Sequence, residues 1–112
     1  MALVQAYKGR NCTRNITILD AANVPIIPDD DDHIRVRIGR AGETPKLIVS
    51  DDAPTAHGST LVKGATQRLR LDAQDLDLID PGVYTLYIEM FDVADLNEWK
   101  NVDRQIFNLE DT

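Results

Sequence analysis

PGVYTLYIEMFD, residues Pro81 to Asp92, is the longest strand-like run of the chain. Proline presets φ at one position of a turn and glycine tolerates positive φ at the next, so the first two residues predict a turn. The run that follows is rich in β-branched and aromatic residues, which fit a pleated, half-buried surface. One face holds Tyr84, Leu86, Ile88 and Met90, and the other holds Val83, Thr85, Tyr87, Glu89 and Phe91. Apolar groups on both faces predict a central strand.

Shorter alternating segments precede this strand. The cleanest is His33 to Arg40, in which isoleucine and valine are expected to face inward and Arg35 and Arg37 outward. In Ala65 to Leu71, Leu69 and Leu71 are expected inward and Arg68 and Arg70 outward. Further strands are predicted at Ala2 to Lys8, Cys12 to Leu19, Lys46 to Val49 and Ser59 to Lys63.

The segments around the central strand complete the expected fold. Asp72 can cap a short helical turn over Ala73 to Leu78, and Asp80-Pro81 ends that turn. The last strand runs from Trp99 to Leu109, and its imperfect alternation predicts a β-bulge near Gln105.

Seven or eight short strands with turn signals between them predict an all-β domain spanning residues 1–112. The expected architecture is an immunoglobulin-like β-sandwich of antiparallel strands, with one short helical turn before the penultimate strand. A small barrel of the OB type is the alternative.

The composition narrows the classes of partner. The chain has 112 residues, 43% of them hydrophobic, and a formal net charge of −7. Nucleic acids and anionic membranes require a basic surface, so neither is expected as a partner. Only 5% of the residues are aromatic, so few side chains are present on which the bases of a single strand or the rings of a sugar could stack. The sequence shows no signal-peptide pattern and no apolar run of ~18 residues, so we expect neither a leader nor a membrane span.

Metal and cofactor chemistry finds little support in the sequence. The acidic run Asp29 to Asp32 is consecutive, whereas calcium takes oxygen ligands from spaced positions. Consecutive residues of an extended chain point in alternating directions, so at most two of these aspartates could hold one ion. His33, His57 and the single Cys12 are too few for a conventional zinc site. We therefore expect no metal and no cofactor.

The residues nearest in type to a catalytic triad are His57 and Ser59, which lie close in sequence to Asp51 and Asp52. A catalytic triad needs an oriented base and an oxyanion hole, and no nucleophile turn of the GxSxG type is present. No catalytic residue is predicted, and we expect the protein not to be an enzyme.

An interaction surface is the remaining candidate. Tyr87 and Phe91 project from the second face of the central strand, and Trp99 begins the neighbouring strand. Large aromatics left uncovered on a sheet face form a surface that favours a partner. Arg35 and Arg37 either pair with acids across the same sheet face or contribute a basic docking patch. The predicted interface therefore consists of Tyr87, Phe91, Trp99, Arg35 and Arg37.

The order of the segments resembles a known family. The pieces are Tyr7-Lys8-Gly9, the strand Thr13-Arg-Asn-Ile-Thr17, the Ile-Arg-Val-Arg-Ile strand, LRLDAQDLDLIDPGVYTLYIEMFD, and a final strand ending Gln105-Ile-Phe-Asn-Leu109. This order resembles the small immunoglobulin-like domains of bacteriophage tail and baseplate proteins, including the N-terminal domain of the baseplate upper protein type.

The resemblance implies a non-enzymatic structural part of a virion, in the tail, in the baseplate or decorating the head, made in the host cytoplasm. It implies contacts with other virion proteins and with copies of itself in a homo-oligomer, and it transfers no catalytic residue. The alternative from another class is a β-sandwich module that binds a carbohydrate or a cell-surface ligand, with calcium as an aid. An enzyme ranks third.

Overall fold

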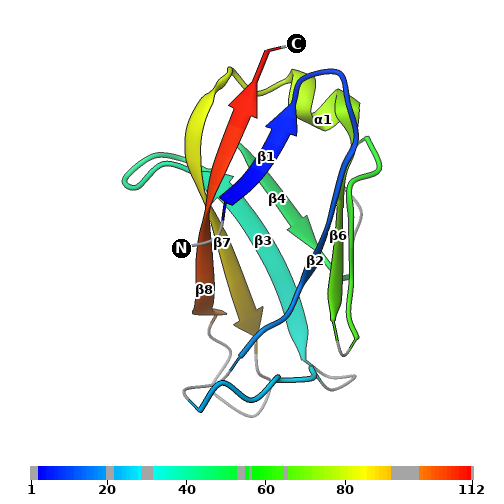
Figure 1. Cartoon of the computed structure of the whole chain (residues 1–112), viewed down its shortest axis with the longest axis vertical. Coiled ribbons are helices and arrows are strands. Elements are labelled where there is room, and N and C mark those ends of the chain that lie inside the picture. Colours follow the sequence, from blue (N-terminus) through cyan, green and yellow to red (C-terminus); the bar gives the residue numbers. More distant parts are fainter. Residues whose placement is uncertain are drawn as a thin grey trace.

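Alternating apolar residues form two β-sheets packed face to face in a computed structural model of the chain (Figure 1). The structure describes residues 3–19, 22–28, 32–52, 55, 57–64, 66–91 and 99–111, with the backbone alone at positions 100 and 101. The described part is mainly β, with eight strands and one short helix. It is sandwich-like, as the alternation predicted, although one sheet is mixed.

The larger sheet has five strands, with the predicted central strand in its middle. Their order is β1 (Leu3–Tyr7), β8 (Trp99–Glu110), β7 (Gly82–Phe91), β3 (His33–Gly39) and β4 (Leu47–Ser50). All neighbours are antiparallel except β1 and β8, which run parallel. The expectation of antiparallel strands throughout is therefore wrong for this pair. No hairpin joins β1 to β8, so no turn imposes an antiparallel direction, and the parallel register buries Val4 and Ala6 beside Phe107 and Leu109.

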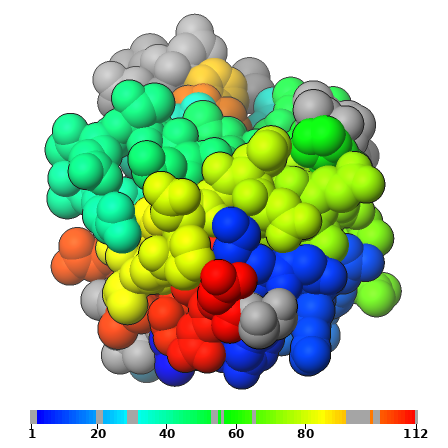
Figure 2. Space-filling model, turned by 90° about the horizontal axis from the view of Figure 1, so that it is seen from above, coloured from blue at the N-terminus to red at the C-terminus, as the bar shows by residue number. Residues whose placement is uncertain are grey.

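The smaller sheet has three antiparallel strands in the order β2 (Cys12–Ile16), β6 (Gln67–Leu71) and β5 (Thr60–Val62). Helix α1 (Ala73–Asp77) follows β6. The Asp72 carboxylate accepts a hydrogen bond from the Gln74 N–H at 2.9 Å, which confirms the predicted cap. From above, the loop after β1, the α1 region, the turn between β3 and β4, and the end of β8 form one end of the molecule (Figure 2).

The core lies between the sheets and under α1. The predicted inward residues of β3 and β6 are in it, and on β7 so are Tyr84, Leu86 and Ile88, whereas Met90 is only partly buried and packs against the core. Val36 and Leu86 have no exposed surface. Its most deeply buried side chains include Ile18, Ile34, Val36, Ile38, Leu69, Leu71, Leu76, Leu86, Ile88, Phe107 and Leu109.

A bulge in β8 decides which side chains reach the outer face. Ile88 pairs with Asp103 but the next residue, Glu89, pairs with Asn101, so Val102 is the extra residue. The predicted bulge exists, but its expected position near Gln105 is wrong, because the strand alternates regularly from there to Leu109. One added residue reverses the faces of a strand. The bulge therefore brings Trp99 to the outer face, opposite Phe91.

Candidate interaction face

The five predicted interface residues gather on the outer face of the five-stranded sheet. Arg35 and Arg37 lie on β3, Tyr87 and Phe91 on β7, and Trp99 on β8. The ladders set Arg37 opposite Tyr87 and Phe91 opposite Trp99. All five are half-buried and outside the core. Together with Glu89 they are called the arginine–aromatic face below.

Glu89 is at the centre of this face. It lies on β7 opposite Arg35 and is 6% exposed. Its Oε1 accepts hydrogen bonds from the Nε of Arg35 and the Nε of Arg37, each at 2.7 Å. Burying a carboxylate is costly unless it is paired, and charge-assisted bonds of this kind are among the stronger ones in proteins. Pairing of these arginines with acids on the same face was one of two alternatives from the sequence, and Glu89 was not assigned to the site. Glu89 could have been recognised as the one charged residue among the outward-facing positions of β7, a strand that is otherwise largely apolar.

Aromatic rings fix the two guanidinium groups. The guanidinium carbon of Arg35 lies 4.1 Å from the centroid of the Trp99 ring, and that of Arg37 lies 5.1 Å from the Tyr87 centroid. Phe91 packs against Trp99 with centroids 5.4 Å apart and planes tilted by 50°. Cation–π contacts at this range are attractive and more so when partly desolvated. The aromatics of this face therefore hold charged groups in place.

The face is locally positive on an acidic chain. Its two arginines and one glutamate leave one formal positive charge, and among the described residues Arg104, opposite Tyr87 on β8, adds a second beside the face. The whole chain carries −7. The Arg35 and Arg37 side chains are 25% and 30% exposed, so part of each side chain is open to a partner.

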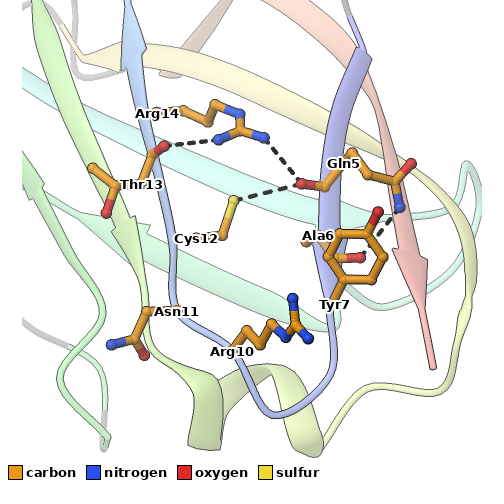
Figure 3. A pocket seen from close by; sticks show the side chains of 8 residues that line it. All are labelled: Gln5, Ala6, Tyr7, Arg10, Asn11, Cys12, Thr13 and Arg14. Carbon is orange, nitrogen blue, oxygen red and sulfur yellow. Dashed lines mark hydrogen bonds between the residues drawn. The ribbon is translucent and has the colours of Figure 1, made fainter. Parts of the chain in front are cut away.

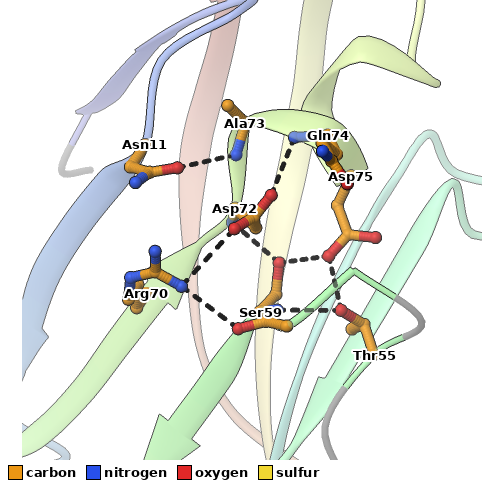
Figure 4. A network of polar contacts seen from close by, with 9 residues as sticks. Asn11, Thr55, Ser59, Arg70, Asp72, Ala73, Gln74 and Asp75 are labelled. Atoms are coloured by element: carbon orange, nitrogen blue, oxygen red, sulfur yellow. Dashed lines mark hydrogen bonds and ion pairs between the residues drawn. The ribbon is translucent and has the colours of Figure 1, made fainter.

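A second polar network anchors α1 to the segment before β5 (Figure 4). The hydroxyl groups of Ser59 and Thr55 both donate to the same carboxylate oxygen of Asp75. Ser59 also accepts a hydrogen bond from the Asp72 N–H at 2.8 Å. Burial by itself raises the pKa of Asp75, but the hydroxyl hydrogen bonds outweigh it and the pKa lies below the ordinary value of an aspartate.

This network accounts for Ser59 without catalysis. Ser59 is fully buried and its hydroxyl proton points to Asp75, while His57 is exposed. Asp51 lies elsewhere, where its carboxylate accepts from the Ile34 N–H at 3.0 Å and lies 3.4 Å from the Nδ1 of His33. The residues considered for a triad are therefore not brought together.

The acidic run can be followed only in part. Asp29, Asp30 and Asp31 lie outside the described residues, and the carbonyl oxygen of Asp32 accepts a hydrogen bond from Lys63 Nζ at 2.7 Å. Among the described residues, no group of three or more histidine, cysteine, aspartate or glutamate side chains is placed to hold a metal ion. In the same part of the chain, no helix is long and apolar enough to cross a membrane.

A cavity of about 260 Å³ lies between β1 and β2, lined by residues 5–7 and 10–14 (Figure 3). Arg14 reaches across it and donates to the carbonyl oxygens of Gln5 at 3.1 Å and Thr13 at 3.0 Å. Burial raises the pKa of the Cys12 thiol, which the charge of Arg14 opposes. Because Arg14 occupies a carbonyl on the open edge of β1, it hinders the addition of another strand there.

Comparison with known proteins gives no family for this chain: no protein-family model matches it, and no curated protein matches it.

Proposed function

We propose that this protein is a non-enzymatic structural component of a bacteriophage virion, in the tail or baseplate or on the head. It acts through contacts with other virion proteins and with copies of itself, and it is made in the host cytoplasm. The order of sequence segments, which resembles phage tail and baseplate domains, supports the virion assignment. The arginine–aromatic face supports the contacts with other virion proteins.

The finer fold that we propose is an immunoglobulin-like sandwich. Its support is the division of the strands, with β2, β6 and β5 in one sheet and β3, β7 and β8 adjacent in the other. Near the start of β7, the Tyr84 hydroxyl donates a hydrogen bond to the carbonyl of Asp80 at 2.6 Å. A tyrosine bonded to the backbone a few residues upstream, at the start of the penultimate strand, is a hallmark of that fold. Cys12 is buried and free, so the inter-sheet disulfide of antibody domains has no counterpart here.

The observation that carries the proposed mode of action is the gathering of Tyr87, Trp99 and the two β3 arginines around Glu89 on one sheet face. Tyrosine, tryptophan and arginine dominate binding energy when a partner buries them. Here their side chains are already fixed by stacking and hydrogen bonds, so binding loses less conformational entropy.

The test is whether the protein belongs to particles. Virus-sized particles are isolated from cells that encode the chain, sedimented in high salt and analysed by mass spectrometry. We expect the protein to sediment with the particles in a fixed ratio to the major particle protein. Recovery only in the supernatant, while the particle proteins sediment, would overturn the virion assignment.

The contact face is tested by hydrogen exchange on the free and the particle-bound protein. We expect added protection in the outer-face segments of β3, β7 and β8. The matched segment is β6, whose outward face carries Arg68 and Arg70 without aromatic neighbours and which should gain none. Protection confined to β6, or absent everywhere, would overturn the assignment of this face.

A carbohydrate-binding module is the second candidate, because half-buried aromatics on one face are also the platform that sugars use. Against it, each guanidinium covers one ring, Arg35 on Trp99 and Arg37 on Tyr87, which leaves less ring surface for a sugar. Retention of the isolated protein on cell-wall polysaccharide, released by free sugar, would favour this candidate.

A further inference from the structure

We propose that the arginine–aromatic face binds an acidic, extended segment of another protein, whose carboxylates pair with the terminal nitrogens of Arg35 and Arg37. The inference rests on the proposed role of this face as a contact surface and adds the chemistry of its partner.

The first support is the unused bonding capacity of the two guanidiniums. Arg35 and Arg37 each donate a hydrogen bond from Nε to the Oε1 of Glu89. Their terminal nitrogens form no hydrogen bond within the described part of the chain. A guanidinium presents five donors in a fixed plane and can take a carboxylate with two parallel bonds. Because Glu89 and the rings of Trp99 and Tyr87 fix both planes, these donors are already oriented for a ligand.

The second support is the spacing. Arg35 and Arg37 are two residues apart on one strand, which corresponds to about 6.8 Å at ~3.4 Å per residue. Alternate side chains of an extended segment repeat at the same interval. An extended acidic segment that lies over the outer face of the sheet, along the direction of β3, can therefore place alternate carboxylates on both arginines.

Charge selects the class of partner. The net charge of −7 on the whole chain repels an acidic peptide. Any electrostatic attraction of such a peptide must therefore come from the locally positive arginine–aromatic face. A nucleic acid carries far more negative charge and is repelled more strongly. Two copies joined symmetrically through this face would set its positive charges against each other, which disfavours self-pairing here.

The experiment is an NMR titration of the ¹⁵N-labelled isolated protein with a hexa-aspartate peptide at low salt. We expect shifts at the amides of Arg35, Arg37, Tyr87 and Glu89 and in the Trp99 indole, and we expect them to vanish at high salt. Arg68 and Arg70 lie two residues apart on β6 and supply the internal control, because they lack the aromatic neighbours and the shared glutamate. Their amides should not move.

The paired variant Arg35→Lys/Arg37→Lys keeps both charges but loses the planar donors, and we expect at least a tenfold weaker affinity for the peptide. The matched variant Arg68→Lys/Arg70→Lys should bind like the wild type. The β3 variant is expected to fold because lysine keeps a positive partner for Glu89, and the β6 variant because it changes only outward-facing side chains. The amide spectra of both variants show whether they do.

Any one of several outcomes would overturn the proposal. They are absence of shifts, equal shifts at both arginine pairs, undiminished binding by the β3 lysine variant, and tighter binding of a single-stranded hexanucleotide than of the peptide. Broadening of the same face on raising the protein concentration without peptide would assign it to a second copy instead. None of these results changes the particle sedimentation test, so failure of this inference is distinguishable from failure of the proposed function.

Discussion

The two outer faces of the sandwich carry the same arginine pattern in different surroundings. On β3, Arg35 and Arg37 share the buried carboxylate of Glu89 and stack on Trp99 and Tyr87. On β6, the pair Arg68 and Arg70 lies between threonine, asparagine and valine residues of β2 and β5.

The residues opposite the β6 pair are Thr13 and Thr60 beside Arg70, and Asn15 and Val62 beside Arg68. These neighbours are exposed and include no acid or aromatic side chain. Arg70 instead forms an ion pair with Asp72, which directly follows β6, and the Nη1 of Arg70 lies 3.6 Å from an oxygen of that carboxylate. The comparison shows that the same arginine spacing gives two different surfaces: on β3 the neighbouring strands supply a shared anion and ring faces, and on β6 they do not.

The largest expected effect comes from removing the shared anion. Glu89→Gln should lower the free energy of unfolding by about 2–3 kcal/mol, because it breaks a buried ion pair and leaves two guanidiniums without their carboxylate. The loss is smaller than for a fully buried pair, since both arginines are partly solvated. Urea denaturation measures it.

The matched control on the other face is Thr60→Val, which changes the residue opposite Arg70. It should alter stability by less than about 0.5 kcal/mol, as ordinary surface changes do. A Glu89→Gln cost as small as that of the control would show that the two faces do not differ energetically.

The next effect concerns the buried carboxylate of Asp75 on α1, the helix that follows the smaller sheet's strand β6. Asp75→Asn should cost about 1–2 kcal/mol at neutral pH, because the hydroxyls of Ser59 and Thr55 then bond a neutral group. The pKa of Asp75 is lower in the folded protein, so its stabilisation is present above the unfolded aspartate value of about 3.9. It is lost as the pH falls through the lowered folded value.

Denaturation of the wild type and the Asp75→Asn variant from neutral to acidic pH checks this dependence. The gap in unfolding free energy between the two proteins should close in acid. A gap of constant size would show that the ionisation of Asp75 does not contribute.

The smallest effects are those of single arginines. Arg35→Ala should cost about 1 kcal/mol, because it removes a charge-assisted hydrogen bond and a stacking contact that are both partly solvated. Arg68→Ala should stay within about 0.5 kcal/mol. Thermal melts of the two variants side by side give the difference, and equal costs would remove the distinction between the faces.

Local patterns predicted the inner side of the fold well. The alternation in β3 and β7 identified Val36 and Leu86 as core residues, and the cap at Asp72 identified the short helix before the penultimate strand. Period-2 alternation needs only neighbouring residues to be read. The same alternation also predicted that Arg35 and Arg37 point outward.

The composition of the interaction face could be predicted only as a set of separate residues. The central acid Glu89 was not assigned, because its contact with Arg35 joins residues 54 positions apart. Such a contact depends on which residues of β3 and β7 face each other, and a one-residue change of register would exchange every partner.

The sequence by itself determined the strands, the inward side chains, the helix cap and the acidic character of the chain, because these follow from local periodicity and composition. Tertiary structure alone decided that β1 runs parallel to β8, that the bulge falls at Val102, and that Glu89 receives two arginines. The physical reason is that strand direction, bulge position and cross-strand partners are fixed when distant segments bury one common core. The backbone ladders then hold them in a single register.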